Sequence, residues 1–130
     1  MDTVDRAINI AARADDLWHL TRVAARLDGD TAIVGWLHDS VEDGYATEAE
    51  LRNIFPAEIV DAVMVVTRRD GEKYDDYITR VIKSDNQMAI TTKVTDLRVN
   101  LARARVDRFS LIERYEEALA RFGVNTDSDD

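Results

Sequence analysis

Apolar side chains recur at every third or fourth position over most of the chain, which is the period of an α-helix. One proline and five glycines are the only strong helix breakers. The pattern therefore predicts an all-α fold, a bundle of about seven to eight helices around one core. The expected helices span residues 2–13, 18–27, 32–42, 47–53, 57–67, 74–83, 86–104 and 111–121.

Polar residues in front of the apolar runs mark several helix starts. Asp15 or Asp16 can cap the second helix, and Ser110 can cap the last one. Thr47, with Glu50 three residues later, forms a capping box. These side chains supply acceptors that the first helical turn needs, so we expect helices to begin beside them.

The expected helix of residues 32–42 is apolar on nearly every face, which predicts that it is the central buried helix. Its C-terminal end, however, carries four ionisable groups: His38, Asp39, Glu42 and Asp43. Side chains four positions apart share one face of a helix, so His38 would lie beside Glu42 and the two aspartates beside each other. Buried charges need partners or a metal ion, and one shared cavity is therefore predicted here.

Length and composition indicate a single domain. The chain has 130 residues, of which 45% are apolar, and domains typically contain about 100–150 residues. We expect the domain to span residues 1–123 and residues 124–130 to form a disordered acidic tail. The apolar run of residues 59–66 is interrupted by Asp61 and is far shorter than the roughly 20 residues of a membrane-spanning helix. The polar first residues lack the features of a secretory signal, so a soluble cytoplasmic protein is expected.

Charge and cysteine content exclude several classes of function. A net charge of −9 argues against a nucleic-acid-binding protein, which needs a continuous basic surface. A small nucleotide remains a suitable partner if basic residues gather around its site. The absence of cysteine excludes disulfides, thiolate metal sites and a cysteine nucleophile. Self-association into a homo-oligomer stays open.

A divalent metal ion would explain why ionisable groups gather on apolar helices. The two histidines, His19 and His38, belong to neighbouring predicted helices, Asp39 follows the second, and Asp96 lies on the long helix of residues 86–104. A cation would relieve repulsion between carboxylates, and neutral imidazole binds it directly. Alternatively, His19 is a surface or interfacial histidine and Asp96 forms a salt bridge with a neighbouring basic residue.

The order of these residues resembles that of a known family. One histidine, a His-Asp pair about twenty residues later and a distant aspartate are typical of HD-domain metal-dependent phosphohydrolases; here they are His19, His38-Asp39 and Asp96. Residues 37–43 are similar to the Leu-His-Asp-x-x-Glu-Asp motif of the hydrolase domain in RelA/SpoT-type alarmone (ppGpp) enzymes. Residues 93–101 resemble their Lys-x-Ala-Asp-Arg-x-x-Asn motif.

The resemblance covers roughly residues 13–105 and includes differences from the alarmone hydrolases. Residues 67–68 and 74–78 also resemble the small stand-alone members. Where the alarmone hydrolases carry an Arg-Lys segment ahead of the first histidine, this chain keeps one basic residue, Arg13. The arginine that usually follows the late aspartate directly is displaced by one position, to Arg98.

The resemblance implies an HD-domain helical bundle with one octahedral Mn²⁺ or similar ion, held by the two histidines and by Asp39 and Asp96. It also implies that Glu42 and Asp43 position and deprotonate an attacking water. Asn100 would hold the nucleotide sugar or base, although it could equally bond a neighbouring backbone group. Lys93 would pair with an acid of the site or with the substrate.

Other residues also allow a functional and a structural interpretation. Arg13 and Arg68 are candidate substrate-binding residues, while a position in an exposed charged loop is the alternative for Arg68. Trp18 and Trp36 are expected to fill the core, and the tyrosines at 74 and 77 are expected to pack against it.

Three functions remain open from the sequence. The first is a metal-dependent phosphohydrolase acting on a nucleotide phosphate ester or anhydride, with ppGpp 3′-pyrophosphohydrolase as the named candidate. The second is a nucleotidase or deoxynucleotide triphosphohydrolase that uses the same site. The third, from another class, is a non-catalytic nucleotide-sensing or partner-binding helical domain with a structural metal.

Overall fold

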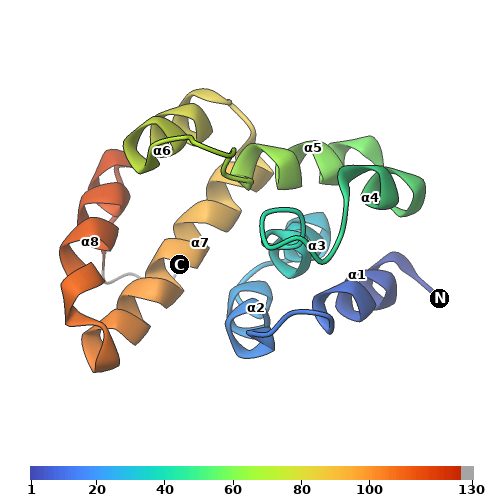
Figure 1. Cartoon of the computed structure of the whole chain (residues 1–130), viewed down its shortest axis with the longest axis horizontal. Helices are drawn as coiled ribbons and strands as arrows, with labels where there is room; N and C mark the ends of the chain where they lie inside the picture. The colour runs from blue at the N-terminus through green and yellow to red at the C-terminus, as the bar shows by residue number, and fades with distance from the viewer. Residues whose placement is uncertain (127–130) are drawn as a thin grey trace.

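The computed structural model describes residues 1–126, and in this part of the chain it is all-helical, as the apolar pattern predicted (Figure 1). The last residues of the predicted tail, 127–130, lie outside the described residues. The α-helices are α1 (Thr3–Ala11), α2 (Leu17–Ala24), α3 (Gly29–Leu37), α4 (Glu48–Ile54), α5 (Ala57–Val66), α6 (Tyr74–Lys83), α7 (Gln87–Asp107) and α8 (Ile112–Arg121), and a 3₁₀ turn, η1 (Phe109–Leu111), precedes the last of them.

Helix α3 is central, because it packs against α1, α2, α5 and α7. Its residues Ile33, Val34 and Leu37 are all buried, which confirms the prediction from its apolar sequence. A β-carbon at Gly35 would lie 2.9 Å from Leu27 Cδ1 and 3.3 Å from the backbone of α2. The glycine therefore permits the close approach of α2 and α3, which brings their polar ends together.

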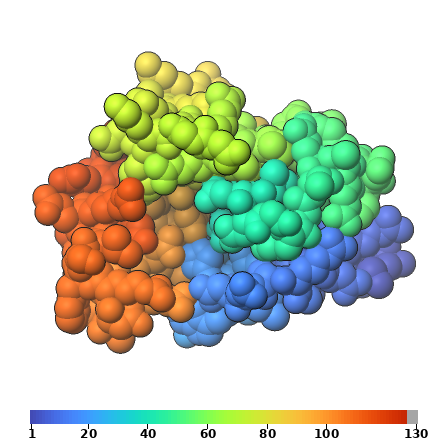
Figure 2. Space-filling view, in the orientation of Figure 1, coloured from blue at the N-terminus to red at the C-terminus, as the bar shows by residue number. Residues whose placement is uncertain are grey.

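Two groups of buried apolar residues form the core. One lies among α1, α3, α4 and α5, and the other among α6, α7 and α8. Helix α7 belongs to both, since Ala89 packs in the first group and Leu97 in the second. Figure 2 shows a hollow between the N-terminal and C-terminal helices, with α7 at its base. The candidate site lies where the N-terminal helices meet the C-terminal helices.

The predicted extension of the central helix through residue 42 is wrong. Helix α3 ends at Leu37, and residues 38–44 form successive turns. Aspartate, serine and glycine favour turns over helix, and Gly44 adopts a left-handed conformation with φ of +78°. The four ionisable groups of this segment are therefore arranged by turns rather than by the spacing of a helix.

Two of the predicted caps are confirmed. Asp16 Oδ1 accepts a hydrogen bond from the His19 backbone N–H, and Thr47 Oγ1 accepts one from Glu50 N–H. The prediction for Ser110 is wrong, because this residue lies inside η1 and makes no capping bond to α8. Among the described residues, no helix is both long and apolar enough to cross a membrane.

The start of the predicted tail contacts the fold. Val124 packs against the C-terminal group of apolar residues, and the Asn125 carbonyl accepts hydrogen bonds from Arg98. The described residues 124–126 thus follow α8 back onto α7.

Candidate metal centre

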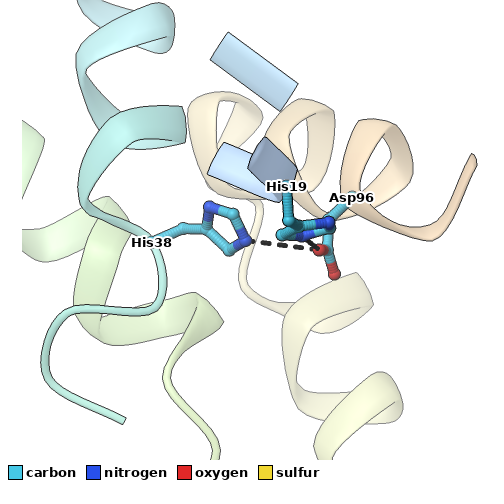
Figure 3. A group of neighbouring side chains, drawn as sticks. All are labelled: His19, His38 and Asp96. Atoms are coloured by element: carbon cyan, nitrogen blue, oxygen red, sulfur yellow. Dashed lines mark hydrogen bonds and ion pairs between the residues drawn. The ribbon is translucent and has the colours of Figure 1, made fainter. Parts of the chain in front are cut away.

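Three buried side chains from separate parts of the chain meet around one carboxylate oxygen. His19 Nε2 lies 2.6 Å from Asp96 Oδ1, and His38 Nε2 lies 3.2 Å from the same oxygen. His19 comes from α2, His38 directly follows α3, and Asp96 comes from α7; Figure 3 shows both rings pointing at the carboxylate. Their ligand atoms all lie within 4.8 Å of one another, so this cluster can hold a metal ion.

Local structure fixes the turn that carries His19 and orients the ring of His38. Asp16 caps α2 at His19 and so fixes the first turn that carries the ring. His38 Nδ1 donates a hydrogen bond to the Gly35 carbonyl at 2.7 Å, which directs Nε2 at Asp96. A backbone acceptor on the outer nitrogen is the arrangement that metal-bound histidines usually have.

The spacing and chemistry of the cluster fit a divalent metal ion. Bonds from such ions to nitrogen and oxygen are about 2.0–2.2 Å long, which places adjacent ligand atoms about 3 Å apart. The separations of 2.6 and 3.2 Å between the histidine Nε2 atoms and Asp96 Oδ1 lie on either side of this value and are also the lengths of hydrogen bonds. Asp39, the fourth predicted ligand, lies at the edge, with Oδ1 3.4 Å from His38 Nε2 and a side chain that is 31% exposed.

Burial and charge act in opposite directions on the acid–base groups of the cluster. Burial lowers the pKa of His38, but the charges of Asp39 and Asp96 raise it more, to about 9. Burial likewise raises the pKa of Asp96, whereas Lys93 and the two histidines bring it well below its usual range. The carboxylate is therefore ionised, and the surrounding cationic groups balance its charge.

Lys93 and Asn100 contact the outer side of the cluster. The Lys93 ammonium donates to Asp96 Oδ2 at 2.9 Å, and Asn100 Nδ2 donates to Asp96 Oδ1 at 3.4 Å. The sequence predicted either an acid of the site or the substrate as the partner of Lys93, and the structure shows the acid, Asp96. Both residues orient the Asp96 carboxylate, while contact with a substrate stays a prediction.

Glu42 and Asp43 lie on the turn that follows His38, at the surface of the molecule. Glu42 Oε1 accepts a hydrogen bond from the Arg68 backbone N–H at 2.7 Å. Burial of the carboxyl groups and the nearby charge of Asp39 raise the pKa of both residues. A carboxylate with a raised pKa takes up a proton more readily, as a group that accepts a proton from water must do.

The two predicted substrate-binding arginines differ in their surroundings. Arg68 lies beside Glu42, and its guanidinium donates to the Glu72 carbonyl and lies 5.7 Å from the centre of the Tyr74 ring. Arg13 instead forms a two-pronged ion pair with Glu50 and donates to the Tyr45 carbonyl. It therefore braces the segment that follows the turn.

No family model matches the chain. Part of the chain is similar to an alarmone hydrolase. That relative, a probable guanosine-3′,5′-bis(diphosphate) 3′-pyrophosphohydrolase from Mycoplasma pneumoniae, is 44% identical over 59 residues. The aligned stretch is 42% of this chain and 8% of the relative, so the chain spans less than a tenth of the relative's length. This likeness supports the predicted relation to such hydrolases over that stretch.

Sequence reasoning missed Arg80, which holds the loop beside the site. Its guanidinium makes two bonds to the Glu72 carboxylate and donates to the carbonyls of Val65 and Thr67. The loop of residues 68–72, expected to be an exposed charged loop, is therefore fixed to α6. The one signal in the sequence was that Glu72 and Arg80 lie eight positions apart. An acid and a base at this spacing are common in proteins.

Proposed function

We propose that the protein is a metal-dependent phosphohydrolase that acts on a nucleotide phosphate ester or anhydride, with ppGpp as the first candidate substrate. This proposal rests on the buried cluster of His19, His38 and Asp96, which lies where the N-terminal and C-terminal helices meet. The likeness to an alarmone hydrolase supports the choice of phosphate chemistry and of ppGpp.

The side chains present can be assigned complementary roles. With Asp39 as fourth ligand, the cluster would hold the ion, for which we propose Mn²⁺. Such an ion lowers the pKa of a bound water and neutralises charge on a phosphoryl group. Glu42 and Asp43, with their raised pKa values, would accept the proton of the attacking water.

A groove of about 520 Å³ lies between α2 and α7, the helices that carry His19 and Asp96. Trp18 on its wall is 46% exposed, so its predicted place in the core is wrong. The guanidinium groups of Arg22 and Arg103 lie 4.6 and 4.9 Å from the Trp18 ring. Aromatic and guanidinium groups suit a nucleobase and its phosphates, which favours a nucleotide over a simple phosphate ester.

A substrate panel tests the proposal. The purified protein would be incubated with Mn²⁺ and ppGpp, deoxynucleoside triphosphates, nucleoside monophosphates or NADPH, and the products would be separated by ion-exchange chromatography. We expect turnover of at least one nucleotide and its loss in His38→Ala. Asp61→Asn removes an exposed carboxylate far along the chain from the cluster and should leave turnover unchanged.

The main alternative is a non-catalytic nucleotide sensor with a structural metal. It predicts that nucleotides raise the thermal midpoint of the Mn²⁺-loaded protein while no product forms from any member of the panel. That combination of results would replace the hydrolase proposal.

A further inference from the structure

A buried tyrosine hydroxyl without a partner lies close to the metal-binding cluster. Among the described residues, nothing hydrogen bonds to the Tyr74 hydroxyl, although the atom is shielded from solvent. Buried hydroxyls in native proteins nearly always have a partner, so this one is suited to bind a ligand. The sequence suggested only a packing role for this residue.

Two chains of contacts connect Tyr74 with the cluster. Its ring lies edge-on to Tyr77, and the Lys93 ammonium lies 5.0 Å from the centre of the Tyr77 ring and 2.9 Å from Asp96 Oδ2. On the other side, Arg68 lies over the Tyr74 ring and its backbone N–H bonds to Glu42. Tyr74 is therefore connected through neighbouring side chains both to the carboxylate of the cluster and to the proposed proton acceptor.

Guanidinium groups from two elements gather at the Tyr74 ring. Arg114 of α8 lies 4.1 Å from the ring centre, and Arg68 of the preceding loop lies 5.7 Å from it. Among the described residues, no carboxylate forms an ion pair with either guanidinium, unlike those of Arg13 and Arg80. Both therefore retain N–H donors that can reach an added anion.

Space for a ligand exists in two cavities lined by these residues. A cavity of about 340 Å³ is lined by Tyr74 and Arg114, and another of about 490 Å³ by Arg68 and Glu42; Lys73 lines both. The smaller cavity contains three cationic side chains and two carboxylates: Lys73, Arg114 and Arg121 against Asp75 and Glu117. Its positive balance contrasts with a chain of net charge −9.

We propose that Tyr74 and Arg114 in the smaller cavity, and Arg68 in the larger one that shares Lys73 with it, bind phosphate groups of the substrate beside the group that is hydrolysed. The planar guanidinium forks match phosphate oxygens, and the tyrosine hydroxyl gains the partner that it lacks. The ligand class is a compound with at least two phosphates, such as a pyrophosphate ester. The identity of this ligand as a substrate rests on the proposed function, whereas phosphate binding by these three residues does not.

Titration of the metal-free protein with inorganic pyrophosphate tests the subsite without any hydrolysis. With EDTA present, isothermal titration calorimetry should detect binding by the wild type. Loss of a charge-assisted hydrogen bond predicts affinity about tenfold weaker in Arg114→Ala and in Arg68→Ala. Tyr74→Phe keeps the ring and should weaken binding by a smaller factor. Lys83→Ala removes one exposed charge from the far end of α6 and should bind as the wild type does.

Circular dichroism checks that each variant is folded, and Arg114→Lys keeps the charge while removing the fork, so it should show intermediate affinity. Absence of pyrophosphate binding by the wild type, or equal affinity in Arg114→Ala and Lys83→Ala, would overturn the subsite. If binding depends on Arg114 while no nucleotide is hydrolysed, the subsite stands and the proposed function fails. If hydrolysis occurs and Arg114→Ala leaves pyrophosphate affinity unchanged, the proposed function stands and the subsite fails.

Discussion

Asp96 is the residue of the site that makes the most contacts with the others. Its Oδ1 faces His19, His38 and Asn100, and its Oδ2 faces the Lys93 ammonium. Lys93 is itself mostly buried, with 12% of its side chain exposed. Removal of the carboxylate charge would therefore leave a buried ammonium without its counter-charge.

Asp96→Asn should lower the free energy of unfolding of the metal-free protein. Breaking a buried ion pair from one side costs about 3–5 kcal/mol, because the remaining charge stays desolvated. Urea unfolding followed by circular dichroism measures this change. Asp61→Asn breaks an exposed pair with Arg52 and should cost at most about 1 kcal/mol. Equal midpoints for the two variants would contradict this account of the site.

Metal binding should depend on each histidine of the cluster. A ligand that binds only the folded state stabilises it by about 2.7 kcal/mol at a concentration of 100 times its Kd. Mn²⁺ should therefore raise the thermal midpoint of the wild type, measured by differential scanning calorimetry, but not that of His19→Ala or His38→Ala. The proposed metal site would be refuted if these variants gained as much as the wild type.

At the scale of elements, the ends of helices decide where the functional groups lie. The apolar period predicted the existence and order of the helices, because it reflects the face that each helix buries. It could not predict that α3 ends at Leu37, because the turn of residues 38–44 is held by its own backbone bonds. Local propensity is a weak guide where such tertiary and turn contacts compete with it.

The contact between α2 and α3 predicts a cost for Gly35→Ala. The added methyl would meet the far end of the Leu27 side chain at 2.9 Å and the backbone of Ala24 at 3.3 Å; overpacking of this kind costs about 1–3 kcal/mol, against a gain of about 1 kcal/mol for alanine over glycine in a helix. Urea unfolding measures the loss. In a double-mutant cycle with Leu27→Ala, the double variant should lose less free energy of unfolding than the sum of the losses in the two single variants. Strict additivity would show that the close approach to Leu27 is unimportant.

The loop that α6 holds should depend on pH through Glu72. Its hydrogen bonds to Arg80 lower the pKa of Glu72 from 4.5 to about 2. A depressed pKa in the folded state contributes stability above pH 4.5, and this contribution disappears as the pH falls towards 2. Glu72→Gln should thus unfold with a deficit of about 2 kcal/mol at pH 7, since both partners are largely buried.

The same urea titrations repeated between pH 7 and pH 2 would show whether this deficit shrinks below pH 4.5. Glu48→Gln, which removes an exposed partner of Arg52, serves as the matched control with a small effect at every pH. A deficit for Glu72→Gln that stayed constant down to pH 2.5 would argue against the ion pair.

At the scale of the whole molecule, the sequence could predict the members of the candidate metal centre better than their surroundings. His19, His38 and Asp96 followed from polar residues in apolar segments together with the resemblance to HD-domain phosphohydrolases. Arg80 and Arg114 did not, because their partners lie on other elements and depend on how α6 and α8 fold against α7. Trp18 was misassigned for a related reason, since its hydrophobicity says nothing about which face of α2 the rest of the chain covers.

The long separation in sequence between the cluster residues gives a bound ion a further consequence. His19 and Asp96 are 77 positions apart, and His38 and Asp96 are 58 apart. An ion held by all three acts as a reversible cross-link that closes large loops between α2, the end of α3 and α7, in the manner of a disulfide. Amide hydrogen exchange of α2 and α7 should therefore slow together when Mn²⁺ is added, and speed up together when a chelator removes it.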